Sequence, residues 1–143
     1  MEKLKSLTWK RLSYCYPDVQ VIKNGVEAQD IYQGGLGDCY LLSALSSIAE
    51  YPDRIKRILR QQQRSPKGAY AVCLCITGQF ETFYIDDLVP VRNNRLAFCH
   101  SDLGELWAIL IEKAYAKAYG GYWNIGNGGF SEPTLRDLTG APS

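Results

Sequence analysis

The segment QGGLGDCYLLSALSSIAE, residues 33–50, places three glycines and an aspartate directly before a cysteine, Cys39. After this cysteine the apolar residues follow the spacing i, i+3, i+4, i+7 and i+8, which is typical of a helix that buries one face. These residues are Leu41, Ala44, Leu45, Ile48 and Ala49. The segment therefore predicts an amphipathic helix that carries Cys39 near its N-terminus and ends near Pro52.

The position of Cys39 suggests thiol chemistry. Unpaired N–H groups and the positive end of the helix dipole stabilise a thiolate, which is the nucleophilic form of cysteine. The preceding glycines allow close approach of a substrate, and the carboxamide of Gln33 is a candidate donor to an oxyanion beside the sulfur. The alternative is a buried structural cysteine on a helix that Asp38 caps. A phosphate-binding loop is disfavoured because GxxxxGK[ST] and GxGxxG are both absent.

The rest of the chain predicts an α+β fold. Residues 1–32 read as an irregular lead-in, and residues 53–64 as a surface helix. Alternating apolar residues then predict three antiparallel strands in segments 69–76, 80–91 and 95–99. Helical spacing returns in residues 103–119 and in a short last helix at 132–138. No βαβ alternation is present, which excludes a doubly wound sheet.

Composition restricts the class of protein. The chain has 143 residues, 46% of them hydrophobic, and a net charge of +1, which suits one globular domain and gives no basic track for nucleic acid. No window is apolar enough for a membrane span, and no leader is expected. An odd number of cysteines without CxxC spacing predicts reduced thiols in the cytoplasm. They are Cys15, Cys39, Cys73, Cys75 and Cys99.

Residues 33–39, followed by an apolar helix, resemble the active-site segment of the calpain cysteine proteases. The resemblance extends over nearly the whole chain, through WKR (9–11), FYIDDLVPV (83–91), FCHS (98–101), ELW (105–107), EKAYAKAYGGY (112–122) and DLTGAP (137–142). It implies that residues 1–143 form the first protease-core subdomain. This is the helical half of a papain-like fold, with a central helix that starts at the cysteine and a small three-stranded antiparallel sheet.

The same resemblance assigns roles to two residues and shows one departure. It implies that Cys39 is the nucleophile and that Gln33 belongs to the oxyanion hole. The family usually carries tryptophan after the nucleophile, whereas this chain has Tyr40. The exchange keeps an aromatic wall and adds a hydroxyl group.

A cysteine protease also needs a histidine base and a polar group that orients it. The one histidine, His100, is expected to be structural, and the family's histidine and asparagine lie in a second subdomain that these 143 residues do not include. We therefore expect the chain alone to be inactive and to need that second subdomain to cut protein substrates. The alternatives are a non-catalytic calpain-like interaction or scaffold module, and a solitary thiol enzyme that uses His100.

The resemblance further implies one calcium site. Its ligands would be the backbone carbonyls of Lys23 and Gly25 and the side chains of Asp30 and Glu105. Oxygen ligands of this kind suit calcium. Without the resemblance, the two acids would read as a solvated loop residue and a first-turn helix residue. A zinc set is a weaker alternative, because its members lie in apolar strands and lack CxxC spacing; it would comprise Cys73, Cys75, Cys99 and His100.

These observations lead to one prediction of function. We expect the nucleophile-bearing subdomain of a calcium-dependent, calpain-like cysteine endopeptidase in the cytoplasm, which cuts peptide bonds through a thioester on Cys39.

Overall fold

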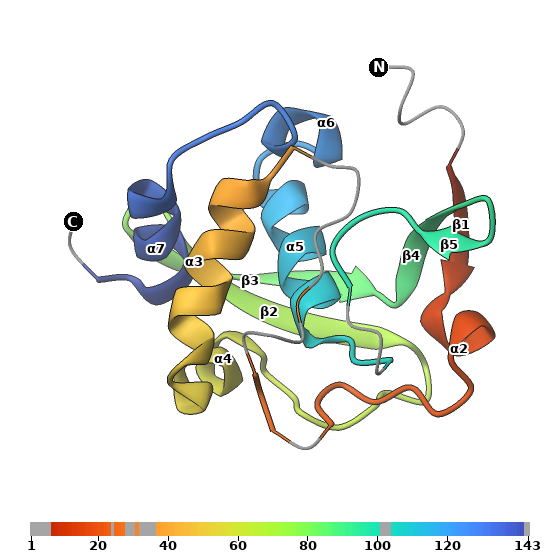
Figure 1. The fold of residues 1–143 in the computed structure, drawn as a ribbon. Helices are drawn as coiled ribbons and strands as arrows, with labels where there is room; N and C mark the ends of the chain where they lie inside the picture. The colour runs from red at the N-terminus through yellow and green to blue at the C-terminus, as the bar shows by residue number, and fades with distance from the viewer. Residues whose placement is uncertain (1–6, 24, 28–30, 32–36, 101–103, 142–143) are drawn as a thin grey trace.

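Figure 1 shows the fold in a computed structural model, which describes residues 7–23, 25–27, 31, 37–100 and 104–141. The mixture of helices and strands confirms the α+β class. In chain order the described elements are β1 (Thr8–Arg11), α2 (Leu12–Cys15), α3 (Cys39–Ala49), α4 (Pro52–Ile58), β2 (Ala69–Ile76), β3 (Gln79–Asp86), β4 (Leu88–Arg92), β5 (Arg95–Leu96), α5 (Trp107–Ala118), α6 (Tyr122–Ile125) and α7 (Ser131–Thr139).

The strands form two antiparallel sheets. β2 and β3 make a hairpin that pairs from Ala69 with Asp86 to Ile76 with Gln79. The second sheet has the order β1-β4-β5. The sequence predicted three strands from segments 69–99, and the structure corrects their partners, because β4 leaves the hairpin and pairs with β1.

Asp87 accounts for this change of partner. Asp87 is the residue between β3 and β4 in the chain, and its buried side chain accepts a hydrogen bond from Arg11 Nη1 at 3.3 Å. Its backbone carbonyl accepts a further bond from the N–H of Leu12, also at 3.3 Å. These contacts hold β4 against β1, so residues 8–15 form a strand and a short helix. The prediction that this stretch is irregular is wrong.

The helices surround the hairpin and α3. α5 and α7 both contact β2, α5 also contacts β3, and α3 packs against α7 and α4. In Figure 1, α5 lies in front of the hairpin that it contacts. The buried face of α3 consists of Leu41, Leu42, Ala44, Leu45, Ile48 and Ala49, which includes every apolar residue that the spacing selected. None of the described helices has the length and apolar character that crossing a bilayer requires.

Two helix boundaries differ from the sequence prediction for local reasons. α4 ends at Ile58, not at residue 64, because Leu59 is extended and forms a bridge with Val72 of β2. α5 begins at Trp107, not at residue 103, because the backbone of residues 104–107 hydrogen-bonds to residues 20 and 21. The short helix α6, which follows α5, was not predicted. The last helix was predicted at 132–138 and lies at Ser131–Thr139.

Replacing Leu45 with alanine tests the importance of the α3 core face. Leu45 is fully buried, and we expect Leu45→Ala to lower the free energy of unfolding by about 2–5 kcal/mol, through lost apolar burial and the cavity left behind. Urea denaturation of the chain measures this value. Ser43→Ala, on the exposed face of the same helix, is the control and should change stability by less than about 0.5 kcal/mol. Equal effects of the two substitutions would contradict the packing.

Candidate active site

Cys39 is the first residue of α3, and its side chain is exposed. All five cysteines lie within the described residues and are free thiols. Cys73, Cys75 and Cys99 are buried, and Cys15 is partly buried. Reagents and substrates in solution therefore meet the thiol of Cys39 first.

Asp38 precedes Cys39 and turns its side chain into the protein. The side chain is 1% exposed and makes no capping hydrogen bond to the first turn of α3. Only its backbone carbonyl joins the helix, accepting the N–H groups of Leu41 at 2.9 Å and Leu42 at 3.2 Å. The alternative in which Asp38 caps the helix is therefore wrong. The carboxyl group of Asp38 therefore does not occupy the backbone N–H groups of the first turn of α3.

A second glycine-rich segment packs against Gly37 at this end of α3. A Cβ atom on Gly37 would lie 2.4 Å from the carbonyl oxygen of Gly126, which is backbone and cannot move aside cheaply. The N–H of Gly128 donates to the carbonyl of Gly37 at 3.2 Å, and Gly37 forms a parallel bridge with Asn127. Only glycine fits at position 37. The loop after α6 is thereby held beside Cys39, as Figure 1 shows for α6 and the start of α3.

Tyr40 also makes hydrogen bonds at both ends of the loop after α6. Its hydroxyl donates to the carbonyl of Ile125 at 2.8 Å, and its own carbonyl accepts a bond from Ser131 Oγ at 3.3 Å. Its ring packs against Gly129, where an added Cβ atom would lie 2.9 Å from the nearest ring atom. Burial, and after it the nearby Tyr115 hydroxyl, raises the pKa of Tyr40 to about 12. The hydroxyl that tyrosine adds in place of tryptophan therefore has a structural partner.

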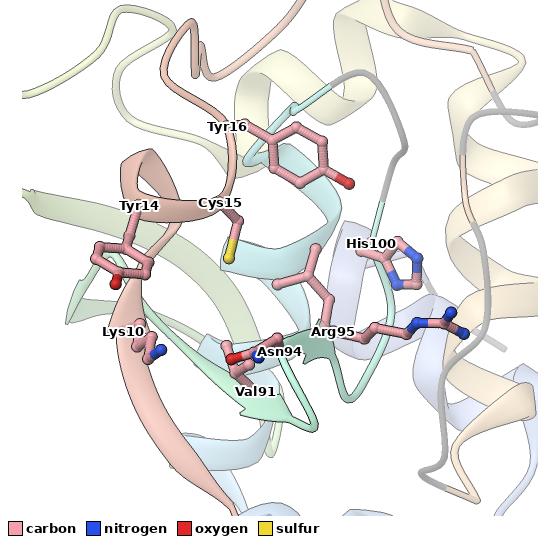
Figure 2. Close-up of a pocket in the computed structure, with 9 residues that line it drawn as sticks. Lys10, Tyr14, Cys15, Tyr16, Val91, Asn94, Arg95 and His100 are labelled. Atoms are coloured by element: carbon pink, nitrogen blue, oxygen red, sulfur yellow. The ribbon is translucent and has the colours of Figure 1, made fainter.

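Of the other candidate site residues, only some fall within the described part of the chain. Gln33 and Asp30 lie outside the described residues. His100 is partly buried, and its Nδ1 is 2.9 Å from the carbonyl oxygen of Phe98. It lines a cavity of about 720 Å³ to which Cys39 does not contribute (Figure 2). The other lining residues are Lys10, Tyr14, Cys15, Tyr16, Val91, Asn94, Arg95 and Leu96.

Two of the predicted calcium ligands lie together. Glu105 is 1% exposed, and its Oε1 accepts the backbone N–H of Lys23 at 2.6 Å. Its Oε2 accepts the indole N–H of Trp107 at 3.1 Å. Gly25, also predicted, has a positive φ of 85° close by in sequence. Among the described residues no three His, Cys, Asp or Glu side chains form a metal cluster, so such a site would depend on backbone oxygens and on Asp30.

An exposed cysteine at the start of a buried helix, within an α+β fold, is typical of cysteine-dependent hydrolases. A family model for calpain family cysteine proteases matches residues 1–143. The chain belongs to the calpain family of cysteine proteases, as the sequence resemblance predicted.

Individual relatives agree with this assignment. Calpain-8 of Rattus norvegicus is 37% identical over 143 residues, which are 97% of this chain and 20% of that protein. Calpain clp-4 of Caenorhabditis elegans is 37% identical over 138 residues, 94% of this chain and 19% of that protein. The calpain-1 catalytic subunit of Homo sapiens is 35% identical over 142 residues, 96% of this chain and 20% of that protein. The chain spans about one fifth of the length of these relatives.

Sequence reasoning missed how the loop after α6 contributes to the site. The string GNGGF, residues 126–130, contained a signal, because three glycines within four positions allow two backbones to approach closely. The sequence of this segment does not indicate that Gly37 is the residue whose backbone it approaches.

Replacing Tyr40 with phenylalanine tests the hydroxyl contact. Tyr40→Phe leaves the carbonyl of Ile125 without this donor, and we expect the free energy of unfolding to fall by about 1 kcal/mol. Tyr14→Phe is the matched control, because Tyr14 is 75% exposed, and should leave stability unchanged within about 0.5 kcal/mol. Chemical denaturation of both variants measures the difference. A Tyr40→Phe variant as stable as the control would show that the hydroxyl does not hold the loop.

Proposed function

We propose that this chain is the nucleophile-bearing subdomain of a calcium-dependent cysteine endopeptidase, with protein substrates and a place in the cytoplasm. The observation that carries the proposal is the exposed thiol of Cys39 at a helix start that Asp38 does not cap. The free state of all five thiols suits a reducing compartment. Membership of the calpain family supplies the reaction class.

In the proposed reaction the Cys39 thiolate attacks the carbonyl carbon of a peptide bond. The Cys39 N–H and the Gln33 carboxamide donate hydrogen bonds to the oxyanion that forms. The amine leaves with a proton from a histidine, which leaves the acyl group on sulfur as a thioester, and water then hydrolyses the thioester. That histidine and an asparagine belong to a second subdomain in our proposal. In this proposal the general base for Cys39 comes only from that second subdomain, so the 143-residue chain by itself is inactive.

The proposed calcium site uses the carbonyls of Lys23 and Gly25 with Asp30 and Glu105. Its support is the adjacency of Lys23 to the buried carboxylate of Glu105. A bound calcium ion would supply positive charge that ties the loop before Cys39 to the start of α5.

Protein cleavage by the full-length protein tests the catalytic role. We expect Cys39→Ala to abolish cleavage of a denatured protein substrate, because no thioester can form without the sulfur. Cys15→Ala removes another accessible thiol outside the site and should retain activity. Gel electrophoresis with mass spectrometry of the fragments follows the reaction. Absence of cleavage by the unmutated full-length protein, with calcium and without it, would favour the scaffold alternative.

Calcium binding has a readout that does not depend on activity. The indole N–H of Trp107 bonds to Glu105, so calcium at Glu105 should change the tryptophan fluorescence of the chain and raise its melting temperature. Glu105→Gln removes one ligand charge and should weaken the apparent calcium affinity at least about tenfold. Glu81→Gln, at an exposed position on β3, is the control and should titrate like the unmutated chain. Identical titrations of all three proteins would remove Glu105 from the site.

A further inference from the structure

Two carboxyl side chains, Asp38 and Glu112, are buried together at the start of α3. Each is 1% exposed, and a hydrogen bond joins them. Asp38 belongs to the turn that precedes Cys39, and Glu112 projects from α5. Acidic side chains are almost never fully buried unless they are paired. The catalytic scheme above uses neither side chain.

The hydrogen-bond inventory of this pair requires a proton. An ionised carboxylate can only accept hydrogen bonds. Asp38 Oδ2 and Glu112 Oε2 each lack a donor among the described residues. One proton held between the two carboxyl groups leaves a single negative charge, whereas two ionised groups would place like charges together away from water.

Burial acts on the pKa values of both carboxyl groups. Burial, followed by the bond to Asp38, raises the pKa of Glu112 well above its ordinary value. Burial also raises the pKa of Asp38, while the bond from Glu112 works in the opposite direction. Burial therefore favours a protonated form of the pair over two ionised carboxylates.

The segment after β5 also contacts the pair. The backbone N–H of Cys99 donates to Glu112, and the Cys99 thiol interacts both with Glu112 and with the Ala108 carbonyl, the latter at 3.6 Å. Burial is the main reason that the pKa of this thiol is raised. The phenols that interact with the pair are Tyr122 of α6 and Tyr40 of α3, and burial is the main reason that both have raised pKa values.

Lys113 is the cation next to Glu112 in sequence, but it serves another carboxylate. Its ammonium group bonds to Asp86 and to the carbonyl of Leu88 at 2.7 Å. The ammonium group of Lys113 is therefore not the group that offsets the negative charge of Asp38 and Glu112.

We propose that Asp38 and Glu112 share one proton, and that this pair positions Cys39 and keeps a second negative charge away from it. The inference rests on the proposed function, because it treats Cys39 as the nucleophile. The pair joins the turn before α3 to α5, and through Cys99 to the segment after β5. Loss of the proton weakens this connection and adds a negative charge near Cys39, which opposes formation of the thiolate by Coulomb repulsion. Glu112 is a positioning residue that acts through Asp38.

Two substitutions remove the shared proton without changing shape. In Glu112→Gln the carboxamide donates to ionised Asp38, and in Asp38→Asn the carboxamide donates to ionised Glu112. Each variant keeps one hydrogen bond and one negative charge, as the protonated pair does, but neither can lose a proton as the pH rises. Glu81→Gln is the control at an exposed position.

Infrared spectroscopy of the full-length protein detects the proton directly. A protonated carboxyl group absorbs at a different frequency from a carboxylate, and ordinary Asp and Glu side chains are ionised at pH 7. We expect the unmutated protein and Glu81→Gln to show one protonated carboxyl band at pH 7 that is absent from Glu112→Gln and from Asp38→Asn. A spectrum of the unmutated protein without this band would overturn the inference.

The pH dependence of Cys39 alkylation tests the effect on the thiol. An uncharged reagent, iodoacetamide, is applied from pH 5 to pH 9.5, and modification of Cys39 is quantified by mass spectrometry. Because the pair loses its proton as the pH rises, the alkylation rate of the unmutated protein plotted against pH should show two transitions. One is the ionisation of the Cys39 thiol, and the other is the loss of the shared proton. Near pH 9 it should fall about threefold to tenfold below the rates of both carboxamide variants. Parallel profiles in all four proteins would overturn the positioning role.

The two measurements separate the inference from the proposed function. If Cys39→Ala retained proteolysis, the proposed function would fail, while the infrared band could still be present. If the band were absent while Cys39→Ala abolished proteolysis, the shared proton would fail alone.

Discussion

The structure around Cys39 depends on the contact between two backbones, at Gly37 and Gly126. The carbonyl oxygen of Gly126 occupies the space that any side chain at position 37 would need. This approach allows the N–H of Gly128 to reach the carbonyl of Gly37, and it places Ile125 where the hydroxyl of Tyr40 can bond to it. Because α3 starts two residues after Gly37, the contact also sets the position of the helix N-terminus.

Two opposite requirements meet at the start of α3. The helix must bury one apolar face against α4 and α7, whereas its first residue, Cys39, is exposed. Asp38 reconciles them by turning inward to Glu112 and leaving the capping position of the first turn unfilled by its side chain. The helix thus gives up a stabilising N-cap contact of about 1 kcal/mol. In exchange, the helix N-terminus remains available for negative charge that develops on sulfur and substrate oxygen.

Local periodicity predicted the elements whose burial follows the chain itself. The apolar spacing from Leu41 to Ala49 specified α3, and the alternation in residues 69–76 specified β2. The family was recognisable because its motifs are contiguous strings. Features that depend on distant partners were not predictable in this way. The pairing of β4 with β1 depends on the buried Asp87, and the inward turn of Asp38 depends on a glutamate 74 positions later in the chain.

Site mapping with a thiol-reactive peptide most directly tests the central claim that Cys39 is the nucleophile of this fold. The full-length protein is treated with a peptide that carries an electrophile in place of the scissile bond, and mass spectrometry locates the modified cysteine. We expect rapid modification of Cys39 alone, with no modification of Cys15 at the same reagent concentration. Modification of Cys39 and Cys15 at similar rates, governed only by their exposure to solvent, would contradict it.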